Sequence, residues 1–447
     1  MKYHITTFGC QMNKSDSERI AGLFDSLNYT KTEDETKADI RIINACSVRQ
    51  SAIDRIFGKA RKWNVEKKRV RRLAEKNKKQ PATTILTGCI LPKDKIKFKK
   101  KFDFVLNIKD LPNWPVEVRL PQCNSNFHTT NKKTYLSITP IYQNKYSAFV
   151  PIMTGCDNFC AYCAVPYTRG REFNRNVKEV LCEIKNLVKN GCLEITLLGQ
   201  NVNTYRPKDK QNFSKKNPYK DSFAALLWEI NQFKKLNRLH FTAPHPKDMT
   251  DEVIDALTLP KMVNYLHLPV QSGDDEILKR MNRNYTANDY LNLIKKIEKK
   301  IPNIALGTDI IAGFPSETKK QFENTVKLYK KAQFDISYTA KYSPRPNTAA
   351  EKMEDNISLE EKKRRWEVLQ KLMEETALKK NQKYKNKIVE VLVDKKIIRQ
   401  PAEKNFYEGN SREYKRVRFY SKKNLVGKIV NVKIDKAMMW MLEGKLE

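Results

Sequence analysis

The order of apolar and polar residues predicts an open α/β domain with a parallel sheet over residues 1–120. Three short apolar runs have the length and composition of strands, at 3–8, 40–44 and 83–87. Ser15 and Glu18 match an S-x-x-E capping box, and the apolar spacing after them indicates a helix. A long basic helix is expected over residues 49–77. Strands that alternate with helices in this way form a parallel sheet with helices on its faces.

A second alternating series follows a polar segment, residues 121–145, which is typical of a linker. Helical patterns separate six further expected strands, at 148–153, 194–198, 239–242, 265–268, 305–311 and 335–341. Six parallel strands with crossover helices predict a partial (β/α) barrel over residues 146–380. Its chemistry is expected at the carboxyl ends of the strands.

The last part of the chain begins with a charged helix, expected over residues 359–387, and continues as a small domain at 384–447. Short β runs at 388–393, 416–420 and 427–434 predict a small antiparallel β-barrel. Basic residues of this region are interleaved with four aromatic residues, Tyr407, Tyr414, Phe419 and Tyr420. Aromatic side chains on a basic β surface suit single-stranded RNA, whereas the alternative is an aromatic core under a coat of lysines.

The net charge of the chain indicates what kind of partner the protein binds. The 447 residues include 86 Lys and Arg against 51 Asp and Glu, a formal net charge of +35. Such an excess favours a polyanion, although a general enrichment in lysine would also produce it. The sequence shows no apolar run near the roughly 18 residues of a membrane span, and residues 1–8 lack the make-up of a secretory signal. We therefore expect a folded cytoplasmic protein that binds nucleic acid and no membrane.

Three of the nine cysteines, Cys10, Cys46 and Cys89, follow the expected strands of the first domain. The carboxyl ends of parallel strands share one edge, so these residues would converge there. Three thiolates on one rim suit a soft metal or an iron–sulfur cluster. The alternative is three small apolar side chains that fill the turns at the strand ends.

Three more cysteines form Cys156-x-x-x-Cys160-x-x-Cys163, directly after the first expected barrel strand. Disulfides are not expected, because the cytoplasm keeps thiols reduced. Three thiolates can hold three irons of a 4Fe-4S cluster and leave the fourth iron open. A structural zinc site needs a fourth Cys or His, and the loop has none. The other cysteines are interpreted as incidental: Cys123 in the linker, and Cys182 and Cys192 packed around a barrel helix.

The cysteine loop at the start of a partial barrel resembles the radical S-adenosylmethionine enzymes, and its surroundings resemble the methylthiotransferases among them. The resemblance covers essentially the whole chain, and the C-terminal domain is similar to the RNA-binding TRAM domain. The segments that carry it include Phe8-Gly9-Cys10-Gln11-Met12-Asn13, Gly155-Cys156-Asp157-Asn158-Phe159-Cys160, Val165-Pro166-Tyr167-Thr168-Arg169-Gly170, Leu198-Gly199-Gln200-Asn201, Gln271-Ser272-Gly273 and Tyr342-Ser343-Pro344-Arg345-Pro346. Ala45 and Ile90 depart from the family pattern beside Cys46 and Cys89 but remove no ligand.

This resemblance implies two 4Fe-4S clusters and S-adenosylmethionine as cofactors. Cys156, Cys160 and Cys163 match the catalytic ligands of a radical cluster, whose open iron binds S-adenosylmethionine. Cys10, Cys46 and Cys89 match the ligands of an auxiliary cluster that carries sulfur. The implied reaction replaces the C2 hydrogen of N6-dimethylallyladenosine 37 in a tRNA anticodon loop with a methylthio group and uses two S-adenosylmethionine. That hydrogen is not acidic, so a cofactor must supply the chemistry.

The implied partners are the tRNA anticodon stem-loop and an electron donor such as flavodoxin or ferredoxin, with the protein as a monomer and the sulfur source open. Further cofactor-binding candidates are Tyr162, beside the third loop cysteine, and a group at strand ends facing the same mouth. That group is Gln200, Asn201, Gln271, Ser272 and Asp309. Each of these residues could instead form a turn or a hydrogen bond in the core. His245 and His267 are interpreted as structural.

Two rival functions remain at this point. The first keeps the chemistry but changes the target to threonylcarbamoyladenosine in tRNA or to a ribosomal protein; the segments at 11–13, 197–201 and 342–346 favour the dimethylallyladenosine branch instead. The second is a noncatalytic RNA-binding protein with structural metal sites. It expects zinc, but two cysteine triads that each lack a fourth ligand do not resemble closed zinc sites.

Overall fold

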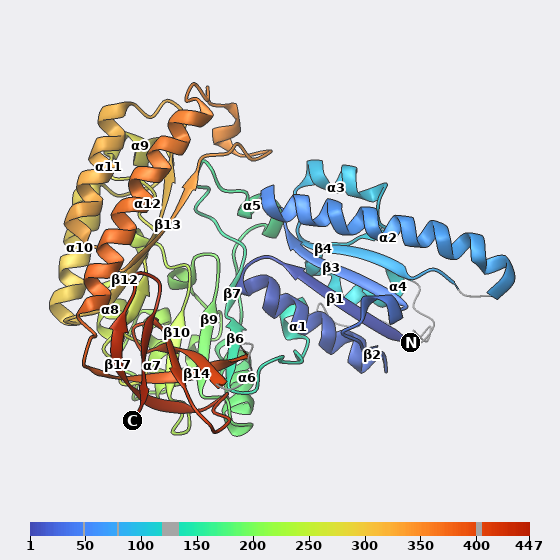
Figure 1. Ribbon diagram of the computed structural model, residues 1–447, viewed down its shortest axis with the longest axis horizontal. Coiled ribbons are helices and arrows are strands. Elements are labelled where there is room, and N and C mark those ends of the chain that lie inside the picture. Colours follow the sequence, from blue (N-terminus) through green and yellow to red (C-terminus); the bar gives the residue numbers. More distant parts are fainter. Residues whose placement is uncertain (48–49, 78–79, 119–133, 399–404) are drawn as a thin grey trace.

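The computed structural model describes residues 1–47, 50–77, 80–118, 134–398 and 405–447, which form three units (Figure 1). We call them the N-terminal unit, the partial barrel and the C-terminal barrel. The N-terminal unit lies beside the partial barrel, and the C-terminal barrel packs against one end of the partial barrel. In the described part of the chain, no helix combines the length and the apolar content that a bilayer crossing requires.

The N-terminal unit is built on a five-stranded sheet of order β2-β1-β3-β4-β5, in which every neighbouring pair is parallel. The three expected strands are present and the parallel class is confirmed. The strands are β1 (Lys2–Phe8), β2 (Thr30–Lys31), β3 (Ile40–Cys46), β4 (Thr83–Cys89) and β5 (Phe104–Val105). The helices are α1 (Gln11–Ser26), α2 (Gln50–Asn77), α3 (Pro92–Lys99) and α4 (Trp114–Glu117).

Alternation along β3 explains why helices cover both faces of this sheet. Ile40 and Ile42 pack with residues of α1, whereas Ile43 and Ala45 pack with residues of α2 and α3. Tyr135 also belongs to the α1 side of the core, although it lies in the segment expected to be a linker. The part of that segment at 121–133, with Cys123, lies outside the described residues.

Helix α1 begins earlier than its sequence predicted. Cys10 is the residue that caps its amino end, and the Cys10 backbone N–H donates to the Asn13 side chain at 3.3 Å. Ser15 and Glu18 lie inside the helix and are buried, so the predicted capping box is wrong. The Glu18 carboxylate instead accepts a hydrogen bond from the Gln143 backbone at 3.2 Å, outside the N-terminal unit's sheet.

The partial barrel contains the six expected parallel strands as two sheets of order β10-β9-β6 and β11-β12-β13. A single parallel bridge between Leu239 and Met262 joins them. The strands are β6 (Ser147–Pro151), β9 (Glu194–Leu198), β10 (Arg238–Phe241), β11 (Tyr265–His267), β12 (Ala305–Ala312) and β13 (Ile336–Lys341). The surrounding helices are α6 (Val177–Lys189), α7 (Ser222–Asn231), α8 (Asp251–Ala256), α9 (Asp275–Arg280), α10 (Ala287–Lys300), α11 (Lys319–Ala332) and α12 (Leu359–Gln382).

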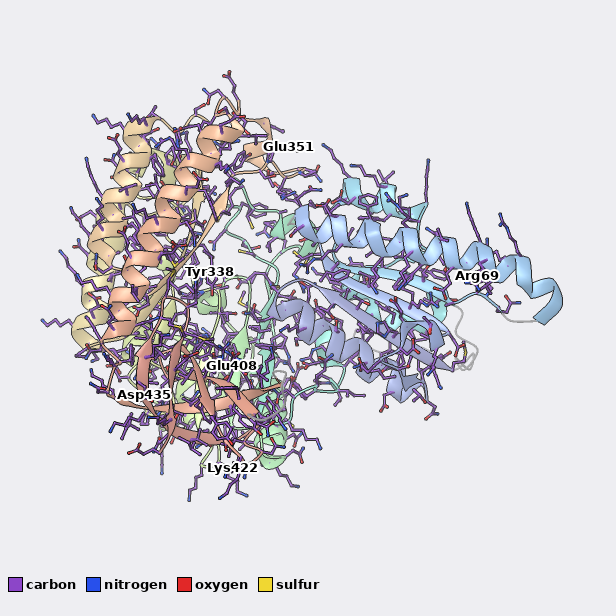
Figure 2. All side chains as sticks on the ribbon, in the orientation of Figure 1. Arg69, Tyr338, Glu351, Glu408, Lys422 and Asp435 are labelled. Carbon is purple, nitrogen blue, oxygen red and sulfur yellow. The ribbon has the colours of Figure 1, made fainter. Side chains whose placement is uncertain are left out.

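The C-terminal barrel is closed, in the order β14-β15-β16-β18-β17. Its strands are β14 (Ile388–Ile398), β15 (Asn405–Ser411), β16 (Arg416–Tyr420), β17 (Ile429–Ala437) and β18 (Leu442–Leu446). Four pairings are antiparallel as predicted, but the pairing that closes the barrel, between β16 and β18, is parallel. The two strands run the same way because β17, which lies between them in sequence, runs the opposite way. Glu408 on β15, labelled in Figure 2, pairs with Arg416 and Arg418 on β16.

One residue of the C-terminal barrel closes the base of the partial barrel. Tyr414, in the turn between β15 and β16, stacks on Tyr265 with ring centroids 5.3 Å apart and contacts His240 at 4.4 Å. Its hydroxyl donates to Glu194 at 3.3 Å. Arg238, fully buried beside it, donates to Glu390 at 2.9 Å. The amino ends of the barrel strands are thus filled by protein, and the carboxyl ends remain for a ligand.

Candidate active site

The loop with Cys156, Cys160 and Cys163 lies at the carboxyl end of β6, between β7 (Met153–Thr154) and the short helix α5 (Val165–Arg169). Gly155 opens the loop with a φ of +81°, and a Cβ there would lie 2.0 Å from the Arg171 carbonyl oxygen. The Gly155 N–H donates to Gln200 Oε1 at 2.6 Å. Gln200 therefore positions the loop through its backbone. A residue larger than Gly155 would displace the loop, because its Cβ would collide with the Arg171 carbonyl oxygen.

Two residues that the sequence did not single out hold the other side of this loop. The Asn282 side chain donates to the carbonyl oxygens of Asn158 and Phe159, both at 3.1 Å. These bonds hold Phe159 in its left-handed conformation, with a φ of +48°. The neighbouring Arg283 guanidinium lies 3.6 Å from Cys160 Sγ and donates to the Pro269 carbonyl oxygen at 2.9 Å. Neither Asn282 nor Arg283 is part of a sequence motif that predicts a functional site.

The chemistry of the three loop thiols fits a cationic cluster. Burial raises the pKa of the Cys156 thiol, and it raises the pKa of Cys163 to about 12. A thiolate at these positions needs positive charge beside it, which a bound metal supplies when it displaces the thiol proton. Within the described ranges no three Cys, His, Asp or Glu side chains share one ion position, whereas a 4Fe-4S cluster takes its thiolates on separate irons.

The other candidate cofactor residues differ in position and in partners: Asn201, Gln271 and Ser272 follow strand ends, whereas Asp309 lies inside β12 and not at its end as expected. Tyr162 packs against a cluster that contains Met281 and Tyr342. Asn201 donates to Asp248 at 2.9 Å, and its Oδ1 is buried without a hydrogen-bond partner. A buried acceptor of this kind normally has a partner, so Asn201 offers one free acceptor to a ligand.

Gln271, Ser272 and Asp309 differ in what their side chains can reach. Gln271, with a φ of +68°, bridges β12 through its backbone. The Ser272 hydroxyl is fully buried, 3.3 Å from the Thr325 hydroxyl, so it serves the packing of α11. Asp309 is partly exposed and its carboxylate lies 3.2 Å from His267 Nε2. Of the three, Asp309 alone has a side chain with exposed charge.

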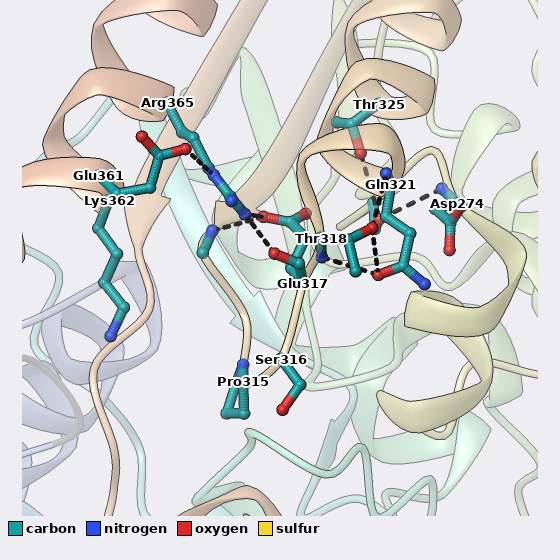
Figure 3. A network of polar contacts seen from close by, with 12 residues as sticks. Asp274, Pro315, Ser316, Glu317, Thr318, Gln321, Thr325, Glu361, Lys362 and Arg365 are labelled. Atoms are coloured by element: carbon teal, nitrogen blue, oxygen red, sulfur yellow. Dashed lines mark hydrogen bonds and ion pairs between the residues drawn. The ribbon is translucent and has the colours of Figure 1, made fainter. Parts of the chain in front are cut away.

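A buried charge network fixes the turn that follows β12 (Figure 3). Glu317 Oε2 accepts from the Gly313 N–H at 2.9 Å and from Arg365 of α12 at 2.7 Å. Arg365 also donates to Glu361 at 2.7 Å. Because Glu317 is nearly fully buried, its carboxylate depends on these bonds, which tie the mouth of the barrel to α12.

The other three cysteines meet at the edge of the N-terminal sheet. Cys46 ends β3 and Cys89 ends β4, and the two residues are opposite each other in the strand register. Cys10 lies two residues beyond β1, whose Phe8 is opposite Ala45. The pKa of the buried Cys89 thiol is raised by a hydrogen bond with Cys46 and by burial. Cys89 and Arg169 of α5 both lie near enough to Cys10 to act on its thiol electrostatically, and Arg169 Nε lies 3.0 Å from Cys89 Sγ, so the convergence inferred from the strand ends is present.

Two expectations about other side chains are wrong. Tyr407 and Phe419 are buried in the core of the C-terminal barrel, so they cannot stack on RNA bases. The Tyr414 ring is already engaged by Tyr265 and His240 at the base of the partial barrel. Tyr420 is partly exposed. Cys182 is exposed on α6 rather than packed, while Cys192 is buried as expected. His245 is buried and its Nδ1 accepts the Lys247 N–H at 3.2 Å, the structural role expected of it.

Two protein-family models match parts of this chain. The family described as "Radical SAM superfamily" matches residues 150–329, and "Uncharacterized protein family UPF0004" matches residues 2–108. Among solved structures, a radical S-adenosylmethionine methyltransferase, TsrM from Kitasatospora setae, aligns with a TM-score of 0.53 and 12% identity, over 78% of this chain and 77% of that one. The cobalamin-dependent S-adenosylmethionine radical enzyme OxsB aligns with a TM-score of 0.51 and 10% identity, over 78% and 54%. The fold and the cysteine loop define a radical S-adenosylmethionine enzyme.

Relatives that align over the full length of the chain identify its family within the radical S-adenosylmethionine enzymes. The tRNA-2-methylthio-N(6)-dimethylallyladenosine synthase of Clostridium botulinum strain Hall is 40% identical over 99% of this chain and 96% of its own length. Those of Bacillus cytotoxicus and Caldicellulosiruptor saccharolyticus are each 39% identical, over 100% and 99% of this chain and 86% and 92% of their own lengths. The chain belongs to the family of tRNA-2-methylthio-N(6)-dimethylallyladenosine synthases.

Proposed function

We propose that this enzyme replaces the C2 hydrogen of N6-dimethylallyladenosine 37 in the tRNA anticodon loop with a methylthio group, in the cytoplasm. The observation that carries the proposal is the pair of cysteine triads, each on its own sheet edge, in a chain related over its full length to enzymes named for this product. Threonylcarbamoyladenosine in tRNA and a ribosomal protein are the alternative targets, and the full-length relatives favour neither.

The two triads would hold two 4Fe-4S clusters. Cys156, Cys160 and Cys163 would bind the radical cluster with S-adenosylmethionine, and Cys10, Cys46 and Cys89 the auxiliary cluster. When bound, the radical cluster and S-adenosylmethionine supply a carbon radical that can remove an unactivated hydrogen. Residues 1–120, 146–380 and 384–447 would be the methylthiotransferase, radical and TRAM domains, joined by a linker at 121–145.

The side chains around the loop have tasks that follow from their contacts. Gln200 holds the start of the loop through Gly155, and Asn282 holds its far side. Arg283 places positive charge 3.6 Å from Cys160 Sγ, beside the site that the radical cluster would occupy. Asn201 and Asp309 would face bound cofactor or base, because each offers an oxygen that the protein does not fully use.

A tRNA partner suits the charge of the molecule. Exposed basic side chains occur on both the N-terminal unit and the C-terminal barrel, for example Arg69 of α2 and Lys422, which are labelled in Figure 2. Neutralised phosphates supply the sequence-independent part of such binding. An external one-electron donor of the flavodoxin or ferredoxin type would reduce the radical cluster, and we expect the enzyme to act as a monomer.

The decisive experiment is nucleoside mass spectrometry of tRNA from cells that make N6-dimethylallyladenosine but lack the methylthio step. Expression of this chain should produce the 2-methylthio nucleoside at position 37, and a Cys156→Ala variant should not. If no product forms although the purified protein holds iron and cleaves S-adenosylmethionine, the target is another tRNA nucleoside or a protein. If the protein holds no iron after reconstitution, the proposed chemistry itself is wrong.

A further inference from the structure

A single buried arginine connects the two cysteine triads. Arg169 ends α5, six residues after Cys163, and its Nε lies 3.0 Å from Cys89 Sγ. The rest of the guanidinium is also engaged: Nη2 lies 2.5 Å from Asp16 Oδ2, and Nη1 lies 3.2 Å from the Tyr135 hydroxyl. Arg169 is only 2% exposed. Each of the three guanidinium nitrogens therefore has a protein partner, and one of these partners is a cysteine of the N-terminal triad.

Arg169 belongs to the partial barrel and not to the N-terminal unit whose cysteine it contacts. Helix α5 follows the radical loop directly, yet it lies against β4 of the N-terminal unit (Figure 1). The partial barrel thus extends one charged side chain into the rim where Cys10, Cys46 and Cys89 meet. Arg345, from the segment after β13, is a second arginine on this side: burial lowers its pKa, and the nearby Asp94 and Cys46 partly oppose that effect.

The balance of charges explains why the rim needs such a residue. Three thiolates and the nearby Asp16 carboxylate are anionic, and burial strengthens their mutual repulsion. Asp16 offsets part of the Arg169 charge, but the guanidinium keeps a hydrogen bond to sulfur. Hydrogen bonds to the sulfur ligands and the local net charge are the two protein variables that set the potential of an iron–sulfur cluster.

We propose that Arg169 is a positioning residue of the auxiliary cluster: it orients the Cys89 thiolate and raises the cluster's reduction potential from the partial barrel. The inference rests on the proposed function, since it requires that the N-terminal triad holds a cluster. It adds that the electronic properties of this cluster depend on a side chain from the other cluster's domain.

The test uses the full-length chain with Cys156, Cys160 and Cys163 changed to Ala, so that only the auxiliary cluster is present. In this parent, the midpoint potential is measured by a redox titration followed by electron paramagnetic resonance. Arg169→Gln should shift the potential to more negative values, because the reduced cluster carries one more negative charge and loses its cationic neighbour. Arg169→Lys keeps the charge but not the geometry, and should fall between the parent and Arg169→Gln.

Two further variants separate this role from a structural one. Arg169→Gln leaves Asp16 buried without its partner, so the double variant Arg169→Gln with Asp16→Asn removes both charges and preserves hydrogen bonding. Because Arg169 acts on Cys89 more strongly than Asp16 does, the potential should still shift to more negative values, by less than in Arg169→Gln, while the fold is retained. Arg19→Gln is the matched control, because Arg19 is also buried between α1 and α6, pairs with Glu183 at 3.0 Å and touches no cysteine in the described structure. Its cluster should keep the parent potential.

The outcomes distinguish the inference from the function on which it rests. If the parent itself assembles no cluster, the two-cluster function fails. If the parent assembles one and Arg169→Gln or the double variant shows the parent's potential and spectrum, Arg169 has no tuning role and the inference is overturned. An equal shift in Arg19→Gln would also overturn it, because any break in the contact between the units would then suffice.

Discussion

Replacing Glu18 with Gln should make the protein more stable at pH 8 but not at pH 4.5. Glu18 is 7% exposed, its Oε1 accepts the Gln143 N–H at 3.2 Å, and its Oε2 is buried without a partner. Burial is the largest cause that raises the pKa of this carboxyl to about 7, against an ordinary value of 4.5. Nearby charges are mixed: Arg19 and Lys14 lower the pKa and Glu183 raises it.

The sign of the pH dependence follows from proton binding. Below pH 4.5 both the folded and the unfolded chain hold this proton, so Glu18 makes no difference. Between pH 4.5 and 7 only the unfolded chain releases it, so the free energy of unfolding falls as the pH rises. At about 1.4 kcal/mol per pKa unit, the loss reaches about 3 kcal/mol above pH 7. Gln keeps the acceptor for Gln143 and carries no charge, so it recovers most of this.

Thermal unfolding midpoints of wild type and Glu18→Gln, measured from pH 5 to 8.5, test the reasoning. We expect the midpoints to separate with rising pH and to differ by about 3 °C at pH 8 for a chain of this length. Glu33→Gln is the matched control, because Glu33 is exposed and paired with Lys31 on the surface. A Glu18→Gln variant no more stable than wild type at pH 8, or stabilised equally at pH 5, would refute the account of Glu18.

Three further predictions concern the cysteine sites. Cys160→Ala should abolish S-adenosylmethionine cleavage, measured as 5′-deoxyadenosine, while iron bound by the N-terminal triad remains; retained cleavage would contradict the assignment of the loop. Cys46→Ala should spare cleavage but stop formation of the methylthio nucleoside, and product in this variant would rule out the sulfur-carrier role. Gln200→Ala leaves the Gly155 N–H without its partner at 2.6 Å, which costs about 1–3 kcal/mol, and should slow cleavage at least tenfold. Gln200→Glu keeps the acceptor and should keep most of the rate. An unchanged rate in Gln200→Ala would show that the loop keeps its conformation without this hydrogen bond.

Local pattern was enough to predict the elements that depend mainly on their own residues. The strand expected at 194–198 is β9 with the same bounds, because Ile195, Leu197 and Leu198 form the short apolar run of a strand that is buried on both faces. The three-residue and two-residue spacings between the loop cysteines were enough to predict a shared site, because residues in one short loop are necessarily close together. The N-terminal triad was predictable only through topology, from the rule that parallel strands end at one edge.

What the sequence did not predict depends on contacts between distant segments. Strand β15 contains Glu408 and Gly409 and reads as polar, yet Glu408 is buried because Arg416 and Arg418 neutralise it from the next strand. Tyr414 looked like an RNA-stacking residue because nothing nearby in the sequence shows that it fills the base of another barrel. Ser15 and Glu18 matched a capping box because the spacing of that motif also occurs inside a helix whose polar side is buried by a neighbour.

Helix α1 shows how these distant contacts serve the site. Its amino end is capped by Cys10, and within the next three turns Asp16 pairs with Arg169 of α5 and Arg19 pairs with Glu183 of α6. A helix rises about 1.5 Å per residue, so these anchors lie within roughly 14 Å of Cys10 along its axis. Buried ion pairs contribute less to stability than apolar packing would, but each is satisfied by one partner in one geometry. Both pairs therefore hold α1 against the partial barrel, but of the two arginines Arg169 alone also contacts a cysteine of the N-terminal triad, at 3.0 Å from Cys89 Sγ.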